Sequence, residues 1–252
     1  MEKVRFRTAL LLLAAISLVG CRADVAGELR IAVASNFAEA MTKIATQFQS
    51  ETGQKVTLSF GSTGKHYAQI RNGAPFDLFF AADVGRPALL EQEGVAVAGR
   101  RFTYAIGKLA LWSPDSSRVD SLGQVLTLDK FRFLAMANPD LAPYGKAARE
   151  VLEAKGVWDQ LQGRIVQGEN IGQSFQFVRS GNAELGFVAY SQVTRNGGPI
   201  EGSIWLVPDS LYKPIEQQAV ILRDAPGARA FVAFVRGDEG QRIIHDFGYE
   251  TP

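Results

Sequence analysis

The stretch "LRIAVASNFAEAMTKIATQFQSETGQKVTLSF", residues 29–60, decides the fold class. It starts with "LRIAVA" (29–34) and ends with "KVTLSF" (55–60), two short apolar runs of the kind that forms buried strands. Between them, "NFAEAMTKIATQFQSETG" (36–53) repeats apolar residues at helical spacing and stops at a glycine. A strand, a helix and a second strand in this order predict an α/β protein with its strands between helices.

The same alternation continues to the end of the chain. The segment at 101–113 is too long and too β-rich for one more short central strand, so it is predicted to cross out of a first lobe. A second α/β set follows, and the strand at 215–223 returns the chain to the first lobe. Further strands are predicted at 76–83, 131–137, 164–167 and 184–190, and helices at 86–94, about 145–155, from about 171, and as one closing helix after Pro226.

Two α/β lobes joined by two extended crossings form a hinged clamshell, an architecture that commonly closes around a ligand. The predicted bounds are 29–106 with 218–252 for lobe I, and 107–217 for lobe II.

The N-terminus has the pattern of an export signal, predicted at residues 1–20. Lys3, Arg5 and Arg7 precede an apolar core that is too short to span a bilayer comfortably. The only cysteine, Cys21, ends "LVGC", which resembles a bacterial lipobox, so Cys21 is a predicted lipid anchor at the cell envelope. The alternative is an ordinary signal peptide cut a few residues later. Without a second cysteine the mature fold has no disulfide.

Composition argues against several classes of function. The 27 basic and 26 acidic residues nearly cancel, so no broad electropositive surface for nucleic acid is expected. With His66 and His245 as the only histidines, neither a zinc site nor a catalytic triad is favoured. We expect no cofactor and no directly bound metal.

Four turns share one property: each ends a predicted strand, carries small or hydroxyl residues, and opens a predicted helix. Helix N-termini beyond the carboxyl ends of strands present unpaired N–H groups, so four of them converging would bind an anion. Any one of them alone is more simply explained by helix capping. The turns are "ASNF" (34–37), "GSTG" (61–64), "APYGK" (142–146) and "ENIGQ" (169–173).

Ser35, Asn36, Ser62 and Thr63 add neutral side-chain donors to these turns. Such donors suit an oxyanion that is fully ionised at neutral pH. A phosphate loop is excluded because Gly61 and Gly64 are too close together. A Ser-x-x-Lys hydrolase stays open as an alternative, since Ser62 precedes Lys65 at the required spacing and "SGN" (180–182) imitates a second element, although no Lys-Thr-Gly is present.

Several motifs occur together in one order: "ASNFAEAM", "GAPFDLFFAAD", "FTYAIGKLALWS", "NPDLAPYGKAA", "IGQSFQFVRSGNAELGFVAYSQ" and "GYETP". With the export signal, they resemble the periplasmic molybdate-binding proteins of bacterial ABC transporters over nearly all of residues 29–250. The resemblance implies the two-lobed, type II binding-protein fold and a monomer without enzymatic activity. It also implies binding of molybdate or tungstate and delivery to a membrane permease. A receptor for sulfate or phosphate is the alternative within this class.

The same resemblance implies a ligand set. Hydroxyls would come from Ser35 and Thr63, with Asn36 and Ser62 beside them as further donors. Main-chain N–H groups would come from Tyr144 in "APYG" and Ile171 in "NIGQ". Where some members have a ligating tyrosine this chain has Ala189, with Tyr190 one residue later, so we expect no further ligand from that strand.

Overall fold

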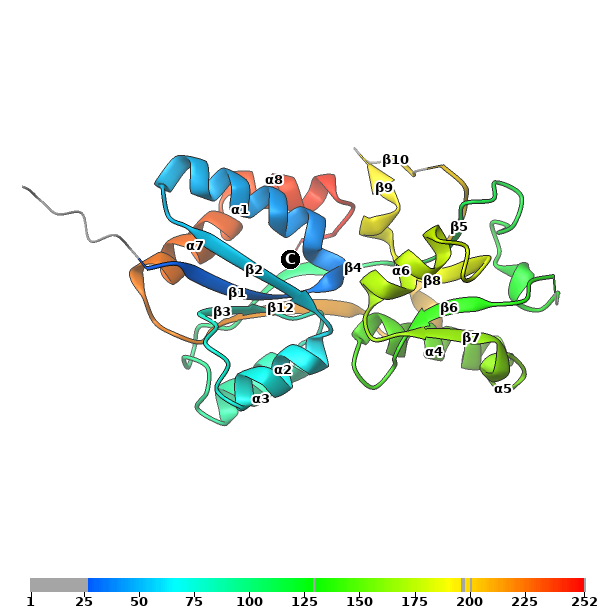
Figure 1. Ribbon diagram of the computed structural model, residues 1–252, viewed down its shortest axis with the longest axis horizontal. Coiled ribbons are helices and arrows are strands. Elements are labelled where there is room, and N and C mark those ends of the chain that lie inside the picture. The colour runs from blue at the N-terminus through cyan, green and yellow to red at the C-terminus, as the bar shows by residue number, and fades with distance from the viewer. Residues whose placement is uncertain (1–26, 129, 196–197, 200, 252) are drawn as a thin grey trace, which may run out of the picture.

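The computed structural model describes residues 27–128, 130–195, 198–199 and 201–251, without the side chains of residues 195, 198 and 199. The chain forms two lobes side by side, each built on a five-stranded sheet (Figure 1). The predicted signal peptide and Cys21 lie outside the described residues. No helix within the described ranges has the length and apolar character of a membrane span.

Lobe I is built on the sheet β2-β1-β3-β12-β4. β1 (Leu29–Ala34) pairs in parallel with β2 (Val56–Gly61) and β3 (Leu78–Phe80). β12 (Ile215–Ile221) pairs antiparallel with β3 and with β4 (Phe102–Gly107).

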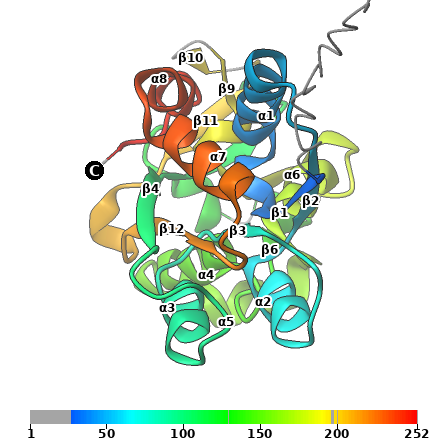
Figure 2. The ribbon, with the colours of Figure 1, turned by 90° about the vertical axis from the view of Figure 1, so that its left-hand side faces the viewer.

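Helices cover both faces of this sheet (Figure 2). One face carries α1 (Ala38–Thr52), α7 (Pro226–Arg236) and α8 (Asp238–Asp246). The other carries α2 (Thr63–Arg71) and α3 (Gly85–Gln92). Leu29, Ile31 and Val33 of β1 enter the core on one side of the sheet and Ala32 enters the core on the other, while Arg30 is exposed.

Lobe II is built on the sheet β11-β5-β8-β6-β7. β6 (Leu134–Ala137) runs parallel to β7 (Ile165–Gly168) and β8 (Leu185–Ala189). β5 (Leu109–Ser113) pairs antiparallel with β8 and with β11 (Ser203–Leu206).

The helices of lobe II are α4 (Pro143–Ala154), α5 (Trp158–Leu161) and α6 (Ile171–Arg179), and β9 (Thr194–Arg195) pairs with β10 (Gly198–Pro199). Short 3₁₀ turns complete the described chain: η1 (Ser35–Phe37), η2 (Gln124–Leu126), η3 (Gln162–Arg164), η4 (Tyr190–Gln192) and η5 (Asp209–Leu211).

The predicted α/β class and two-lobed architecture are confirmed. Two details differ from the sequence prediction. The segment 101–113 is two strands, since β4 ends at Gly107 and β5 begins at Leu109 in the other sheet. The single closing helix is wrong: Gly237 is extended, with φ −77° and ψ 169°, and separates α7 from α8.

The predicted lobe bounds remain a prediction, and each lobe is defined by the sheet on which it is built. All of β12 therefore counts as lobe I. The C-terminal tail also joins lobe I, because the main chains of Ile106 and Glu250 exchange hydrogen bonds of 2.7 and 3.1 Å.

Candidate oxyanion-binding site

A small cavity lies where four helix starts meet between the lobes. All six residues predicted to bind the ligand line it, and no lining residue is charged. Lobe I contributes Ser35, Asn36, Gly61, Ser62, Thr63 and Ala82, and lobe II contributes Ala142, Pro143, Tyr144, Asn170 and Ile171. The topology explains this meeting, since each turn follows the carboxyl end of a strand at the edge where the two sheets face each other.

The three serine and threonine hydroxyls at the cavity already accept hydrogen bonds from backbone amides. Thr63 Oγ1 accepts from Ala82 N at 3.0 Å, and Ser62 Oγ accepts from Lys65 N at 3.3 Å. Ser35 Oγ accepts from Gly172 N of lobe II at 3.2 Å. A hydroxyl that accepts in this way keeps its own proton to donate. The arrangement therefore presents hydrogen-bond donors to a ligand.

At the start of α2, the first-turn amides can be accounted for one by one. Ser62 is the N-cap residue. Gly64 N donates to Leu141 O at 2.9 Å and Lys65 N to Ser62 Oγ. The Thr63 amide remains, at the first helical position, where no intrahelical acceptor exists.

The start of α6 follows the same logic. Asn170 is the N-cap residue, and its Oδ1 accepts from Gln173 N at 3.1 Å. Gly172 N is bonded to Ser35 Oγ, which leaves the amide of Ile171 at the first helical position. At α4 the first residue, Pro143, has no N–H, so Tyr144 carries the first amide of that helix. These helix ends also bring a positive partial charge to the cavity.

The Asn36 side chain is used for structure. Its Nδ2 donates to Gln217 Oε1 at 2.7 Å and to the Tyr249 hydroxyl at 3.0 Å. Both amide protons are therefore taken, so the predicted side-chain donor of Asn36 is not available and only its main-chain N–H is left for a ligand.

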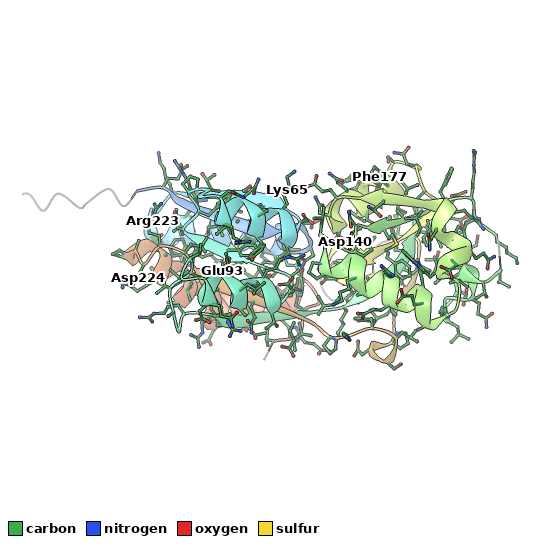
Figure 3. All side chains as sticks on the ribbon, turned by 90° about the horizontal axis from the view of Figure 1, so that it is seen from below. Lys65, Glu93, Asp140, Phe177, Arg223 and Asp224 are labelled. Atoms are coloured by element: carbon green, nitrogen blue, oxygen red, sulfur yellow. The ribbon has the colours of Figure 1, made fainter. Side chains whose placement is uncertain are left out.

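Direct contacts hold the two lobes together around the cavity. Besides the bonds made by Gly64 and Gly172, Arg86 Nη2 donates to Asp140 O at 2.9 Å, and Lys65 Nζ lies 2.9 Å from Glu169 Oε1. Figure 3 shows Lys65 and Asp140 beside the junction, on opposite lobes. The structure is thus that of a closed clamshell.

Known proteins that resemble this chain are binding proteins, in agreement with a ligand site between two lobes. The model of a bacterial extracellular solute-binding protein family matches residues 29–250. The chain belongs to this family. The molybdate-binding protein ModA of Azotobacter vinelandii is 50% identical over 235 residues, 92% of this chain and 93% of that protein. ModA of Rhodobacter capsulatus is 47% identical over 90% of this chain and 89% of that protein.

A solved structure shows the same likeness. The periplasmic molybdate-binding protein of Azotobacter vinelandii superimposes with a TM-score of 0.86 at 43% sequence identity. The match covers 89% of this chain and 99% of the other.

Charged side chains of this solute-binding protein stay outside the cavity wall. Lys65 is half exposed and pairs with Glu169, while the Ser62 hydroxyl is occupied in capping α2. The Lys65 ammonium group therefore pairs with a carboxylate of lobe II. A lysine that served as the base for a serine nucleophile would instead contact the serine hydroxyl. Asp83 Oδ1 accepts from Arg86 N in the first turn of α3 at 3.0 Å, so this carboxylate is engaged by the helix start.

His66 is buried in α2, with Nδ1 3.1 Å from Gln69 Oε1. Burial lowers the pKa of its imidazole, so the ring is neutral at pH 7 and adds no charge next to the cavity. In the described part of the chain, no cluster of three or more His, Cys, Asp or Glu residues could hold a metal ion.

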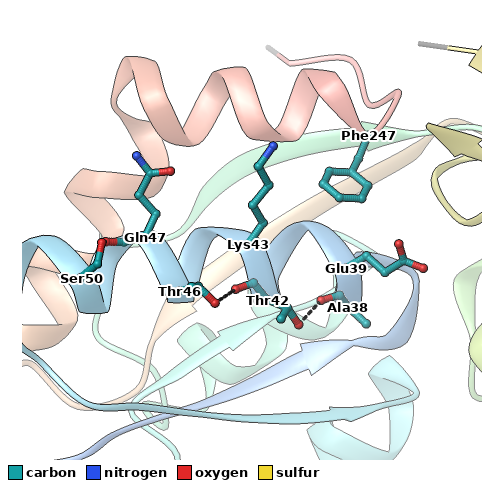
Figure 4. Close-up of a pocket in the computed structure, with 8 residues that line it drawn as sticks. All are labelled: Ala38, Glu39, Thr42, Lys43, Thr46, Gln47, Ser50 and Phe247. Atoms are coloured by element: carbon teal, nitrogen blue, oxygen red, sulfur yellow. Dashed lines mark hydrogen bonds between the residues drawn. The ribbon is translucent and has the colours of Figure 1, made fainter. Parts of the chain in front are cut away.

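A larger groove of this solute-binding protein lies along α1 and reaches Phe247, and unlike the cavity it is lined by charged side chains, those of Glu39 and Lys43 (Figure 4). Its threonine hydroxyls are turned to their own helix. Thr42 Oγ1 donates to Ala38 O at 2.7 Å, and Thr46 Oγ1 donates to Thr42 O at 2.8 Å. The small cavity between the lobes is therefore the better candidate for the ligand site.

Sequence reasoning missed a buried polar cluster next to the cavity. It contains Tyr104 and Gln217 from lobe I, Tyr144 from lobe II, and Tyr249 from the C-terminal tail. Its one sequence signal is Gln217, a polar residue among the apolar positions of β12. Tyr190, which we did not expect to bind the ligand, is not among the cavity's lining residues.

The buried tyrosines predict a loss of stability in alkali. Burial raises the pKa of Tyr104, Tyr144 and Tyr249. Above about pH 10 the unfolded chain releases phenol protons that the folded state retains, so the free energy of unfolding falls as pH rises. Melting curves between pH 7 and 11 should show this fall, and Tyr249→Phe should make it shallower. A melting temperature that stays constant to pH 11 would contradict the assignment.

Proposed function

We propose that this protein captures molybdate outside the cytoplasm, accepts tungstate as well, and delivers the anion to the membrane permease of an ABC transporter. One observation carries the proposal: an uncharged cavity between two lobes, lined by donor groups from four helix starts. ModA proteins that are 50% and 47% identical support molybdate as the ligand, since they are named for binding it.

The proposed mechanism is binding without catalysis. Lobe I donates from Ser35 and Thr63, with Ser62 beside them, and lobe II donates from the amides of Tyr144 and Ile171. Closure then separates the dianion from water. Each hydrogen bond to a charged acceptor contributes roughly 1.5 to 3 kcal/mol net. Several such bonds together offset the cost of removing the anion from water.

Titration calorimetry with molybdate, tungstate, sulfate and phosphate tests the proposal. We expect heat of binding with molybdate and tungstate, and much weaker binding of sulfate. Sulfate has the same shape and charge, but its shorter bonds do not let it reach donors on both lobes at once. Equal or tighter binding of sulfate or phosphate would make this a receptor for another oxyanion.

Hydrolysis by a Ser-x-x-Lys enzyme is the rival from another class. The engagement of Lys65 with Glu169 disfavours it, and covalent attachment of a labelled β-lactam to Ser62 would support it over transport. The transport proposal includes no cofactor, no nucleic acid and a monomeric protein. The ligand's metal is held only as an oxyanion.

We also propose that Cys21 is acylated after export and anchors the protein to a membrane of the cell envelope. Bacteria grown with a labelled fatty acid should label the wild-type protein and not Cys21→Ser. Label on the Cys21→Ser protein would show that the lipid is attached elsewhere, and no label on either protein would show that the chain is not acylated.

A further inference from the structure

Gln217 of β12 bonds to side chains of both lobes. Its side chain is fully buried and is not among the residues that line the cavity. Within lobe I, Gln217 Oε1 accepts from Asn36 Nδ2 at 2.7 Å and from the Tyr104 hydroxyl at 3.0 Å. Toward lobe II, Gln217 Nε2 donates to the Tyr144 hydroxyl at 3.3 Å.

The bonds of Gln217 lead to two of the four helix starts at the cavity. Asn36 lies in η1 next to Ser35, whose hydroxyl faces the other lobe and accepts from Gly172 N. Tyr144 carries the first amide of α4. Its N–H is at the cavity, and its phenol hydroxyl accepts from Gln217. One amide side chain therefore connects a donor turn of lobe I with a donor turn of lobe II.

The backbone around Gln217 leaves space for its bond to Tyr144. Gln217 sits at a register shift between β12 and β4, directly before Gln218. Gly107, at the end of β4, has no side chain, and a Cβ atom there would collide with the Tyr144 hydroxyl and with Gln217 Nε2. The missing side chain is what lets Tyr144 reach Gln217 at the hinge.

We propose that Gln217 is a positioning residue that stabilises the closed state by holding Tyr144 and the Asn36 turn in register, without touching the ligand. This rests on the proposed function, since it assigns the residue to the same anion site. The bond to Tyr144 joins the lobes, so opening breaks it. Its loss should speed dissociation of the anion and leave the association rate nearly unchanged.

Three variants separate this role from general support of the fold. Tyr144→Phe removes only the hydroxyl and keeps the main-chain N–H at the cavity. Gln217→Met removes all bonds of the amide at similar volume. Tyr212→Phe is the control, because its buried hydroxyl accepts from Leu109 N and donates to Asp209, both in lobe II.

For Tyr144→Phe we expect about fivefold weaker molybdate binding, the effect of one neutral hydrogen bond. For Gln217→Met we expect about tenfold or more, since several partners lose a bond. The double variant should bind no more weakly than Gln217→Met alone, because both changes remove the same connection. Tyr212→Phe should lower the melting temperature and change the affinity less than twofold.

Hydrogen exchange of the protein without any anion provides a readout that does not depend on the ligand. The amides of Gly64 and Gly172 are bonded across the lobes, whereas β1 and β2 are paired inside lobe I. Gln217→Met and Tyr144→Phe should speed exchange at Gly64 and Gly172 and leave the β1–β2 amides at wild-type rates. Faster exchange throughout lobe I would show a merely structural role and overturn the proposal.

Unchanged affinity and exchange in Tyr144→Phe, or additive effects in the double variant, would also overturn the positioning role. Failure of the proposed function has a different signature, which is no binding of any of the four oxyanions by the wild-type protein. In that case the exchange rates at Gly64 and Gly172 still decide whether Gln217 holds the lobes together.

Discussion

Gly64→Ala should weaken molybdate binding on the order of 100-fold, about 3 kcal/mol, while making the anion-free protein slightly more stable. A Cβ atom at residue 64 would lie 3.0 Å from Leu141 O, 3.1 Å from Arg86 Nη2 and 3.2 Å from Leu141 Cα. The Leu141 atoms are backbone of lobe II and cannot rotate away. The added methyl group therefore holds the lobes apart and strains the bond from Gly64 N to Leu141 O.

The two effects of this substitution have opposite signs. Residue 64 is the second residue of α2, where alanine is favoured over glycine by up to about 1 kcal/mol, the difference found in helix interiors. Calorimetry and thermal melts of the same sample measure both. Gly85→Ala is the matched control, because no atom lies within 4 Å of a Cβ there and Gly85 also starts a lobe I helix. Wild-type affinity in Gly64→Ala would mean that the bound state is more open than this structure.

Thr63→Val should weaken molybdate binding about 10- to 100-fold, since it removes a donor to a charged ligand. The substitution keeps the shape of the side chain and also leaves Ala82 N, which bonds to Thr63 Oγ1 at 3.0 Å, without its acceptor. An unsatisfied buried amide costs about 1 to 3 kcal/mol, so the anion-free protein should melt at a lower temperature as well.

Thr63→Ser is the control for the methyl group, because it retains the hydroxyl. It should stay much closer to the wild type than Thr63→Val in both affinity and melting temperature. Affinity that is equal in Thr63→Val and wild type would remove this hydroxyl from the ligand set.

The sequence predicted the elements that depend on local pattern. Periodicity located β1 at residues 29–34, and the hydroxyl- and glycine-containing turns identified helix starts whose lining residues meet at one cavity. Helix capping and anion binding need the same residue types, so only the convergence of four turns separated the two interpretations.

What the sequence did not predict depends on contacts between distant segments. β11 is a four-residue edge strand without a signal of its own, and it forms because β5 offers it an edge. The break at Gly237 was missed because apolar spacing continues into α8. The bonds of Gln217 to Asn36 and Tyr144 span 181 and 73 residues, and periodicity carries no information at that range.

The way the cavity's hydroxyls are occupied has a consequence for ligand discrimination. Their oxygens already accept from backbone amides, and none of the lining residues carries a carboxylate. An oxyanion that retains a proton at neutral pH would bring an O–H group to a lining that offers it no charged acceptor, and burying an O–H group without a strong acceptor is costly. We therefore expect the site to discriminate between anions by their protonation state as well as by their radius. It should favour those that carry no proton at neutral pH.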